Sequence, residues 1–512
     1  MLNRRAFCLS ALSAASPAAS RHYHVCLSVD ALDKNPELLE TIRTAGVQTV
    51  WLAGFLYGHW YYTPERVAAW AVRIRKMGMT AEVVHVPLGH PGDSLGAQIG
   101  EPPLTPPAHW RQGVKADGTR HWGTSLHAPA TEENVAAMRR WQGTGIRSVF
   151  LDDDFRLATG PGTIGGCHCD SHWASFRQRG GYGESTRNVL LQDLQTRSLT
   201  PLVRDWIDFH CSELTNCFRQ LAAAQRGVEA GVMVMYLGAE KAGIRLADYR
   251  RTPFRVGELM FDDRHFEPVK GKADELFSAL FHRRFAAPEL SFSETTAFPA
   301  DRLSSRNMAA KLAVSTLSDV RHTMFMSGLT PFPASHWGTL APAMHRHAEL
   351  HRRVAGLRPE GPLKHYWGDW SRMVGRDEPF SLFLALGVPF EVCDDVPREG
   401  WTFLSDDDAK GVQKAGGTRL ITRRDVAETL PELFAWRRAI LRELGTTPYV
   451  VEEAPVVCSW LRTARLALIW NLSDEARRLT IRHGDWQRAV ETGPLALELV
   501  ELGDPGKAAS RG

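Results

Sequence analysis

The stretch Ser148-Val-Phe-Leu-Asp-Asp-Asp-Phe155 joins a short apolar run to three consecutive carboxylates and leads into a glycine-containing loop. Its apolar part is typical of a strand that is buried on both faces. Three adjacent carboxylates directly after such a strand cannot all ionise without cost, so at least one should keep its proton or have a bound partner. General acid catalysis needs a carboxyl group tuned in this way. Taken alone, the stretch is equally consistent with an acidic loop that caps the next helix or pairs with Arg156.

The same order of strand, loop and helix repeats from Tyr23 to about Gly328. Apolar runs typical of buried parallel strands stand at Val25–Val29, Thr49–Ala53, Ala81–Val86, Ser148–Asp152, Gly231–Leu237, Glu258–Phe261, Leu290–Ser293 and Thr323–Met326. Helical patterns lie between several of them, for example at Pro36–Ala45, Pro64–Met77, Glu132–Gly143, Leu199–Arg226 and Arg302–Ser318. Eight strands separated by helices predict an α/β fold of the (β/α)8 TIM barrel type. The alternative is a doubly wound open sheet, which usually has a glycine-rich phosphate loop after its first strand, and Val29-Asp-Ala-Leu32 has no glycine.

The pattern changes after the barrel, and two smaller domains are predicted there. We assign residues 21–345 to the barrel and 346–445 to a small α/β domain of flavodoxin or amidotransferase type. From Tyr449 onward the apolar runs are short and β-like, so residues 446–512 are expected to form a C-terminal β-sandwich.

Composition narrows the function classes. The chain has 512 residues, a net charge of +3 and 23% charged residues, so no nucleic-acid partner is expected. No apolar run is long enough to span a membrane, so no membrane partner is expected either. Residues 1–20 combine the pair Arg4-Arg5 with a weakly apolar run and small residues, as in a twin-arginine export signal. We therefore expect a periplasmic or secreted protein.

A barrel carries its functional residues where the strands end. The candidates at these ends are Asp152, Asp153 and Asp154 after the fourth strand, His85 and His90 at the third, Tyr236 at the fifth, Asp263 and His265 at the sixth, Glu294 at the seventh and Trp337 at the eighth. Tryptophans that stand beside polar or glycine residues are candidate platforms for sugar rings: Trp60, Trp122, Trp173, Trp337, Trp367 and Trp370.

Opposed carboxylates across a barrel mouth suit cleavage of a glycosidic bond, because one protonates the leaving oxygen and the other attacks the sugar or activates water. The whole plan resembles the family 42 β-galactosidases and related clan A glycoside hydrolases. The run Leu151-Asp-Asp-Asp-Phe155 is similar to the family's apolar–Asp–Asn–Glu–aromatic run, and Ser293-Glu-Thr295 is similar to its nucleophile strand.

The resemblance implies an exported, retaining glycoside hydrolase that acts on an oligo- or polysaccharide, needs no cofactor and forms a homo-oligomer. Asp154 would be the acid/base and Glu294 the nucleophile, with Asp153 at the family's Asn position. Asp replaces the family's Glu and Asn at these two positions, which shortens the reach of the acid and adds a charge. The remaining candidates, Asp152, His85, Tyr236, Asp263, His265, Trp337 and Trp122, would contact substrate.

Three alternatives stay open. Asp262-Asp263 would supply the acid/base if strands four and six form the catalytic pair, with Asp152 or Asp153 as the nucleophile. A metal-dependent hydrolase on the same barrel would use His85, His90, Asp153, Asp263 and His265. A catalytically silent barrel would bind carbohydrate without cleaving it. Cys167-His-Cys169, near His172, offers metal ligands, but no second cysteine pair stands at finger-like spacing, so no metal site is assigned.

Overall fold

The computed structural model describes residues 21–88, 106–121, 126–152, 155–160, 162–235, 237–257, 260–412 and 417–507. The predicted export signal lies outside the described residues, as do His90, Trp122, Asp153, Asp154 and Tyr236. Within the described ranges, no helix is both long enough and apolar enough to cross a lipid bilayer.

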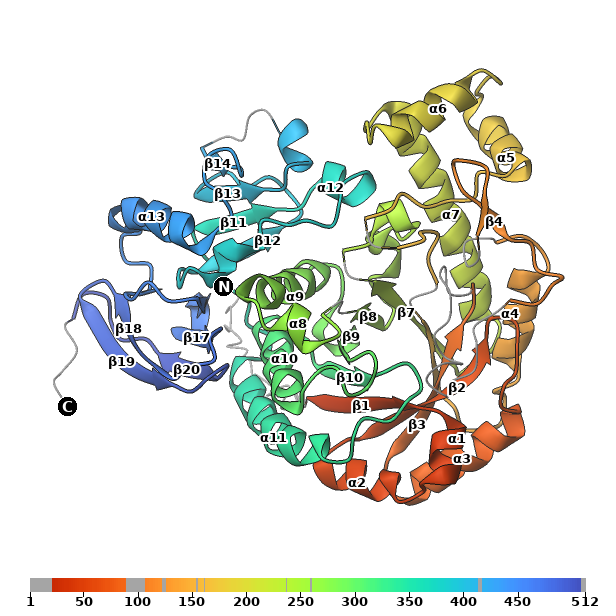
Figure 1. Ribbon diagram of the computed structural model, residues 1–512, viewed down its shortest axis with the longest axis horizontal. Helices are drawn as coiled ribbons and strands as arrows, with labels where there is room; N and C mark the ends of the chain where they lie inside the picture. The colour runs from red at the N-terminus through yellow and green to blue at the C-terminus, as the bar shows by residue number, and fades with distance from the viewer. Residues whose placement is uncertain are drawn as a thin grey trace, which may run out of the picture.

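Eight parallel strands close into a barrel, which occupies the right-hand side of Figure 1. In hydrogen-bonded order they are β1 (His22–Leu27), β10 (His322–Met326), β9 (Ser291–Thr296), β8 (Phe254–Gly257), β7 (Glu229–Met235), β6 (Ser148–Leu151), β3 (Thr80–Val86) and β2 (Thr49–Leu56). Every residue of β2 is buried, as expected for strands that helices cover on one side and the barrel core covers on the other. The predicted TIM barrel is confirmed.

Helices surround the barrel, and local sequence signals set where they begin. They are α1 (Val29–Lys34), α2 (Leu38–Ala45), α3 (Pro64–Lys76), α4 (Ala130–Arg139), α5 (Asp170–Gly180), α6 (Thr186–Gln195), α7 (Pro201–Ala223), α8 (Asp263–Phe266), α9 (Val269–His282), α10 (Ser305–Leu317) and α11 (His336–Val354). The side chains of Thr63, Thr200 and Ser304 cap α3, α7 and α10 by accepting backbone N–H groups.

The sixth barrel strand is the one that the sequence pattern misplaced. A strand was expected at Glu258–Phe261, whereas β8 spans Phe254–Gly257. The reason is Arg255, which interrupts the apolar run in the sequence but is completely buried in the structure. Its charge is compensated inside the barrel, so a charged residue at the centre of this strand does not mark a loop.

Three further sheets follow the barrel and lie to the left in Figure 1. The second domain has a parallel sheet of order β12 (Phe390–Cys393), β11 (Leu363–Tyr366), β13 (Trp401–Leu404) and β14 (Arg419–Ile421), with α12 (Asp369–Met373) and α13 (Leu430–Ile440). The C-terminal domain has two antiparallel sheets, β15 (Tyr449–Val450) with β18 (Arg477–His483) and β19 (Trp486–Thr492), and β16 (Val456–Leu461) with β17 (Leu466–Asn471) and β20 (Leu497–Glu501).

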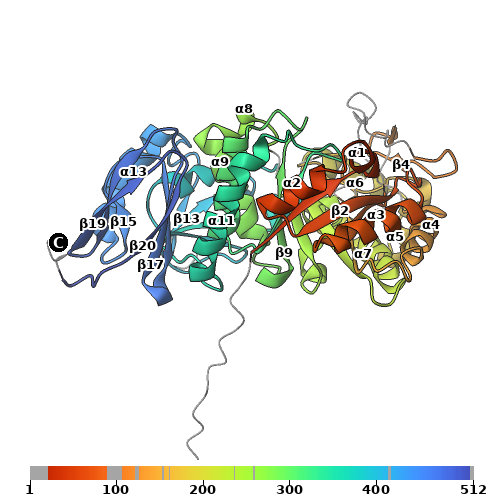
Figure 2. The same ribbon diagram turned by 90° about the horizontal axis from the view of Figure 1, so that it is seen from below.

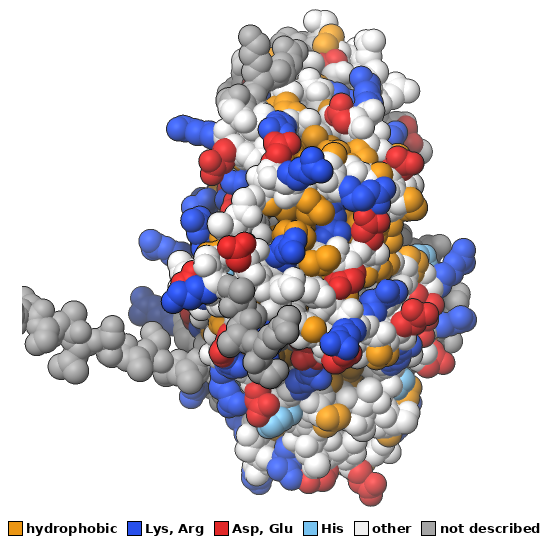
Figure 3. Space-filling view, turned by 90° about the vertical axis from the view of Figure 1, so that its left-hand side faces the viewer, with side chains coloured by type: hydrophobic (Ala, Val, Ile, Leu, Met, Phe, Trp, Pro, Cys, Tyr) orange, Lys and Arg blue, Asp and Glu red, His pale blue; other side chains and the backbone are white. Residues whose placement is uncertain are grey.

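The three domains form an elongated molecule with the barrel at one end (Figure 2). Both C-terminal sheets contribute to one apolar core, which includes Val456, Ile469 and Ile481 and gives this domain its sandwich character. The outer face of the two smaller domains carries hydrophobic side chains interspersed with acidic and basic ones (Figure 3).

Candidate functional site

An arginine from the sixth barrel strand lies between carboxylates from the fourth and seventh strands. Nη2 of the buried Arg255 donates to Oδ1 of Asp152 at 2.5 Å, and its Nε lies 3.1 Å from Oε2 of Glu294. The other Glu294 oxygen, Oε1, accepts a hydrogen bond from the hydroxyl of Thr296 at 2.6 Å. The guanidinium carbon is 5.1 Å from the centre of the Phe150 ring. These contacts join three strand ends in one buried polar cluster.

Charge compensation explains why two carboxylates can be buried here. Asp152 is 6% exposed and Glu294 4% exposed, and an isolated carboxylate at that depth would be strongly unfavourable. The guanidinium of Arg255 stays protonated and favours the charged form of both. Glu294 is thereby an oriented anion, which is what a carboxylate nucleophile must be. Asp152, which was expected to contact substrate, is instead a buried counter-ion of the arginine.

Sequence reasoning missed Arg255, although one signal for it exists. A single arginine in the otherwise apolar run Phe254–Gly257 is unusual for a barrel strand, because a buried charge needs a partner. Carboxylates at the ends of other strands were the available partners. The strand predicted at Glu258–Phe261 begins three residues after this arginine, so Arg255 was not among the candidate residues.

His85 lies at the carboxyl end of β3, but it is held in a neutral form. Its Nε2 accepts a hydrogen bond from Nε1 of Trp141 at 2.9 Å, so the ring proton is on Nδ1. Burial lowers the pKa of His85 to about 3. The ring packs edge-on against Trp60 and close to Phe55. This environment suits a fixed hydrogen-bonding residue rather than a proton-transferring one.

Asp263 and His265 lie at the start of α8 and hold a neighbouring loop. One carboxylate oxygen of Asp263 accepts three hydrogen bonds, from the backbone and the hydroxyl of Ser304 and from the amide of Asn307, at 2.7–2.9 Å. His265 pairs with Asp262 at 2.7 Å. The carboxylate of Asp263 is thus engaged in loop structure, which weakens the alternative in which it acts as the acid/base.

Half of the predicted sugar platforms are core residues. Trp337, in the first turn of α11, is 3% exposed and packs at right angles to Phe325 and Phe332. The prediction that it presents a free ring face is therefore wrong, and Trp173 and Trp367 are likewise buried. Trp337 is buried because the first turn of α11 packs against Phe325 of β10.

Two cysteines and two histidines converge beside the loop that follows β6. His127, Cys167, Cys169 and His172 offer ligand atoms that all lie within 4.8 Å of one another. Sγ of Cys169 is 3.1 Å from Nε2 of His127 and 3.4 Å from Nδ1 of His172. Both cysteines are free thiols. The sequence indicated too few ligands because His127 is distant in the chain, 40 residues before Cys167.

This donor set fits a structural zinc ion. Zinc prefers four tetrahedral nitrogen and sulfur ligands, with bonds of about 2.0–2.3 Å that put neighbouring ligand atoms roughly 3.3–3.8 Å apart. Burial lowers the pKa of His172 to about 4, so its ring is neutral and available as a ligand. Four protein ligands would leave no open position, so the ion would stabilise the loop after β6 and take no part in bond cleavage.

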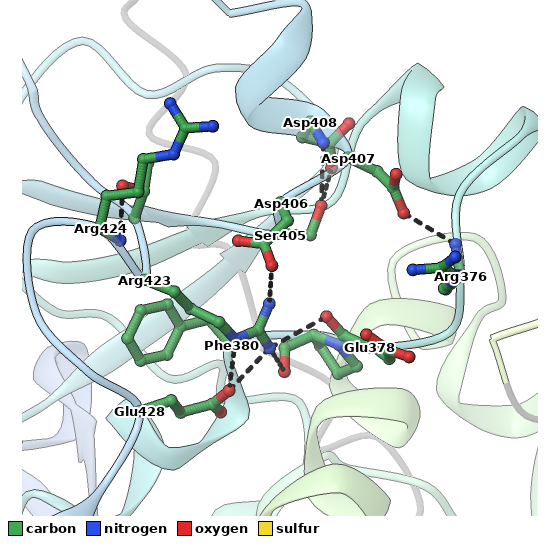
Figure 4. Close-up of polar contacts among 12 residues, drawn as sticks. Arg376, Glu378, Phe380, Ser405, Asp406, Asp407, Asp408, Arg423, Arg424 and Glu428 are labelled. Atoms are coloured by element: carbon green, nitrogen blue, oxygen red, sulfur yellow. Dashed lines mark hydrogen bonds and ion pairs between the residues drawn. The ribbon is translucent and has the colours of Figure 1, made fainter. Parts of the chain in front are cut away.

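The carboxyl edge of the second-domain sheet is the other place where an α/β fold binds ligands. Here its own side chains occupy the edge (Figure 4). Asp408 accepts hydrogen bonds from the hydroxyl of Ser371 at 2.6 Å and the backbone of Gly368 at 2.8 Å. Arg423 donates to Glu428 at 2.7 Å. The described residues of this edge bind one another, which favours a structural role.

No protein-family model matches the chain, and no curated protein matches it in sequence. Solved structures do match. A β-galactosidase from the Antarctic haloarchaeon Halorubrum lacusprofundi is 11% identical, with a TM-score of 0.60 over 94% of this chain and 99% of that chain. Gan42B, a GH42 β-galactosidase, is 8% identical, with a TM-score of 0.60 over 94% and 98% of the two chains.

The fold is that of the family 42 β-galactosidases. The likeness runs through all three domains, since it covers most of both chains. An α-L-fucosidase isoenzyme from Paenibacillus thiaminolyticus is also similar, at 8% identity and a TM-score of 0.54 over 91% of this chain and 93% of that chain. At these identities the likeness concerns the fold, and function depends on the residues of the site.

Proposed function

We propose that this protein is a retaining glycoside hydrolase whose nucleophile is Glu294 and whose acid/base is Asp154. The observation that carries the proposal is the buried cluster of Asp152, Arg255 and Glu294 at the strand ends of a barrel shared with β-galactosidases. Strand four ends in three consecutive carboxylates, and Glu294 of strand seven forms an ion pair with Arg255, which also donates a hydrogen bond to Asp152 after strand four.

The reaction would proceed in two steps. Glu294 attacks the anomeric carbon while Asp154 donates a proton to the leaving oxygen, which gives a covalent glycosyl-enzyme. Asp154 then takes a proton from water, and the water oxygen replaces the Glu294 oxygen on the sugar. Arg255 keeps Glu294 charged before attack, and the hydrogen bond from Thr296 fixes its orientation.

Hydrolysis of a panel of 4-nitrophenyl glycosides tests the proposal, with the β-galactoside and the α-L-fucoside measured first. Glu294→Gln and Asp154→Asn should each lower kcat/KM by at least about a thousandfold on the substrate that is cleaved. Glu229→Gln is the matched control, because it removes an exposed carboxylate from β7 at the opposite end of the barrel. Equal activity of Glu294→Gln and the control would overturn the assignment.

The same panel separates the alternatives. A silent carbohydrate-binding barrel would cleave nothing and still bind a glycan. A chelator would inactivate a metal-dependent hydrolase before the protein unfolds. Of its proposed ligands, His85 binds Trp141, while Asp263 and His265 bind the residues around α8. Within the described part of the chain these three do not form a ligand group, so the two-carboxylate reaction is favoured.

Export and self-association belong to the same proposal. The pair Arg4-Arg5 motivates export, which cell fractionation of the full-length protein with and without Arg4→Lys/Arg5→Lys tests. Retention of the double variant in the cytoplasm is expected. Homo-oligomerisation rests on the resemblance to family 42, and light scattering of the purified protein tests it.

A further inference from the structure

A cavity of about 690 Å³ lies beside the loop that follows β6. Three segments line it: residues from Leu157 to His168, the turn between β4 (Gly113–Val114) and β5 (Arg120–His121), and the helix α6 with Arg197 just beyond its end. Figure 1 shows α6 and β4 on the same outer side of the barrel, next to α7. Asp152 and Leu157 are only five residues apart, so this cavity begins within roughly 18 Å of the buried carboxylate cluster.

One face of α6 presents three amide side chains to this cavity. Asn188, Gln192 and Gln195 are spaced four and three residues apart, which places them in one row on the helix. None of these side chains hydrogen-bonds another described residue, and neither does the hydroxyl of Thr159 on the facing loop. The cavity therefore contains a row of neutral donors and acceptors that are free to bind a ligand.

The rest of the lining limits the class of ligand. Leu157, Ile164, Leu191 and Leu194 supply apolar surface between the polar groups. Lys115 and Asp117 carry opposite charges on the hairpin turn and together favour neither an anion nor a cation. The guanidinium of Arg197, which also lines the cavity, donates to the backbone carbonyls of Gly162, Val374 and Gly375. A neutral molecule with many hydroxyls and small apolar faces suits such a lining, and a carbohydrate chain has both properties.

We propose that this cavity is a second glycan site, which binds a part of the substrate chain away from the bond that is cleaved. The inference rests on the proposed function, since it takes the ligand to be the same glycan. The amides of Asn188 and Gln192 bind sugar hydroxyls, and the leucine side chains contact the C–H faces of the sugar rings. The site gives the enzyme a preference for chains over short saccharides.

Binding measured by calorimetry tests the site without depending on turnover. The protein carries Glu294→Gln so that substrates stay intact, and the probes are di- and tetrasaccharides of β-1,4-linked galactose, glucose, mannose and xylose. At least one tetrasaccharide should bind more tightly than its disaccharide. Adding Asn188→Ala/Gln192→Ala should weaken that tetrasaccharide about tenfold, because two hydrogen bonds are lost. Gln178→Ala, an exposed glutamine on α5, is the matched control and should change nothing.

Each outcome decides the matter. The second site is overturned if no tetrasaccharide of the panel binds, or if every tetrasaccharide binds only as tightly as its disaccharide. It is also overturned if Asn188→Ala/Gln192→Ala leaves tetrasaccharide affinity unchanged. Both substituted side chains lie on the cavity side of α6 and bind no described residue, so an unchanged Tm is expected to verify folding. Hydrolysis of 4-nitrophenyl glycosides is measured separately: activity there with no tetrasaccharide effect overturns this inference alone, whereas binding without hydrolysis overturns the proposed function alone.

Discussion

Arg255 is the residue on which the buried carboxylate cluster depends. Substitution by methionine keeps much of the volume and removes the charge, leaving Asp152 and Glu294 buried near one another without a counter-ion. The free energy of unfolding should fall by roughly 3–5 kcal/mol, as for other broken buried ion pairs. Urea denaturation measures it. Arg226→Met, at an exposed arginine, is the control and should change stability by less than about 0.5 kcal/mol.

Addition of Asp152→Asn to Arg255→Met distinguishes charge compensation from simple packing. The second substitution removes one of the two uncompensated charges, so it should restore part of the lost stability. A double variant that is less stable than Arg255→Met would contradict the role assigned to the ion pair.

Three histidines at the opposite end of the barrel make the fold sensitive to acid. Nε1 of Trp51 donates to His24, and His24 in turn lies 3.0 Å from Nδ1 of His322. Burial, reinforced by the neighbouring histidines, lowers the pKa of His24 well below its ordinary value and that of His322 to about 3, and burial also lowers that of His22. All three rings are therefore neutral in the folded protein near pH 7.

The sign of the pH dependence follows from these directions. Below pH 6.5 the unfolded chain binds protons that the folded histidines do not, so stability should fall as the pH is lowered towards about 3. Each such histidine contributes up to about 1.4 kcal/mol per pH unit. Urea denaturation at pH 7 and pH 5 measures how much the free energy of unfolding falls between the two pH values. This fall should be smaller in His322→Phe than in the unsubstituted protein. It should be unchanged in His345→Gln, which substitutes an exposed histidine. An equal loss in His322→Phe would contradict the account.

At the scale of elements, the loop after β6 is organised by the four metal-ligand candidates. The purified protein should contain about one zinc ion per chain by elemental analysis, and a chelator should lower Tm by several degrees because the ion binds only the folded site. Cys167→Ser/Cys169→Ser should contain no zinc. Cys393→Ser, a buried free cysteine of β12, should keep it. A zinc-free protein that also fails to bind added zinc would refute the site.

Sequence periodicity predicts helices and strands correctly where the buried residues are apolar, and it fails where a charged residue is buried. The helix expected at Pro64–Met77 is observed at Pro64–Lys76, because its N-cap and first-turn proline are local signals. The strand containing Arg255 was placed four residues late, because its partners Asp152 and Glu294 are distant in the chain. His127 was missed as a ligand for the same reason. Local signals such as helix caps can be recognised in the sequence, whereas contacts between residues on distant barrel strands cannot.

At the scale of the whole molecule, the second domain holds the loop that follows β6. Asp377 binds Lys241 at 2.6 Å and accepts the backbone N–H of Gly162 at 3.1 Å. Lys241 is fully buried and also donates to the carbonyl of Ser371 at 2.7 Å. Its own carbonyl accepts from Gly165. The loops after β6 and β7 are thus tied to each other and to the second domain.

Asp377→Asn tests whether this contact serves catalysis as well as stability. The substitution leaves Lys241 buried without its anion and loosens the loop near Gly162, so kcat should fall several-fold while KM changes less. Asp394→Asn is the matched control, since it removes another contact between barrel and second domain, the pair with Arg284. Equal losses of kcat in the two variants would show that domain contact alone, and not this loop, is responsible.

Trapping of the glycosyl-enzyme is the most direct test of the central claim. A 2-deoxy-2-fluoro glycoside of the sugar that the protein cleaves reacts with a retaining enzyme and stays bound to its nucleophile, where peptide mass spectrometry locates it. The account predicts a single label on Glu294, and none on the Glu294→Gln variant. A label on Asp152, Asp153 or Asp263, or rapid turnover of the other substrates without any label, would contradict it.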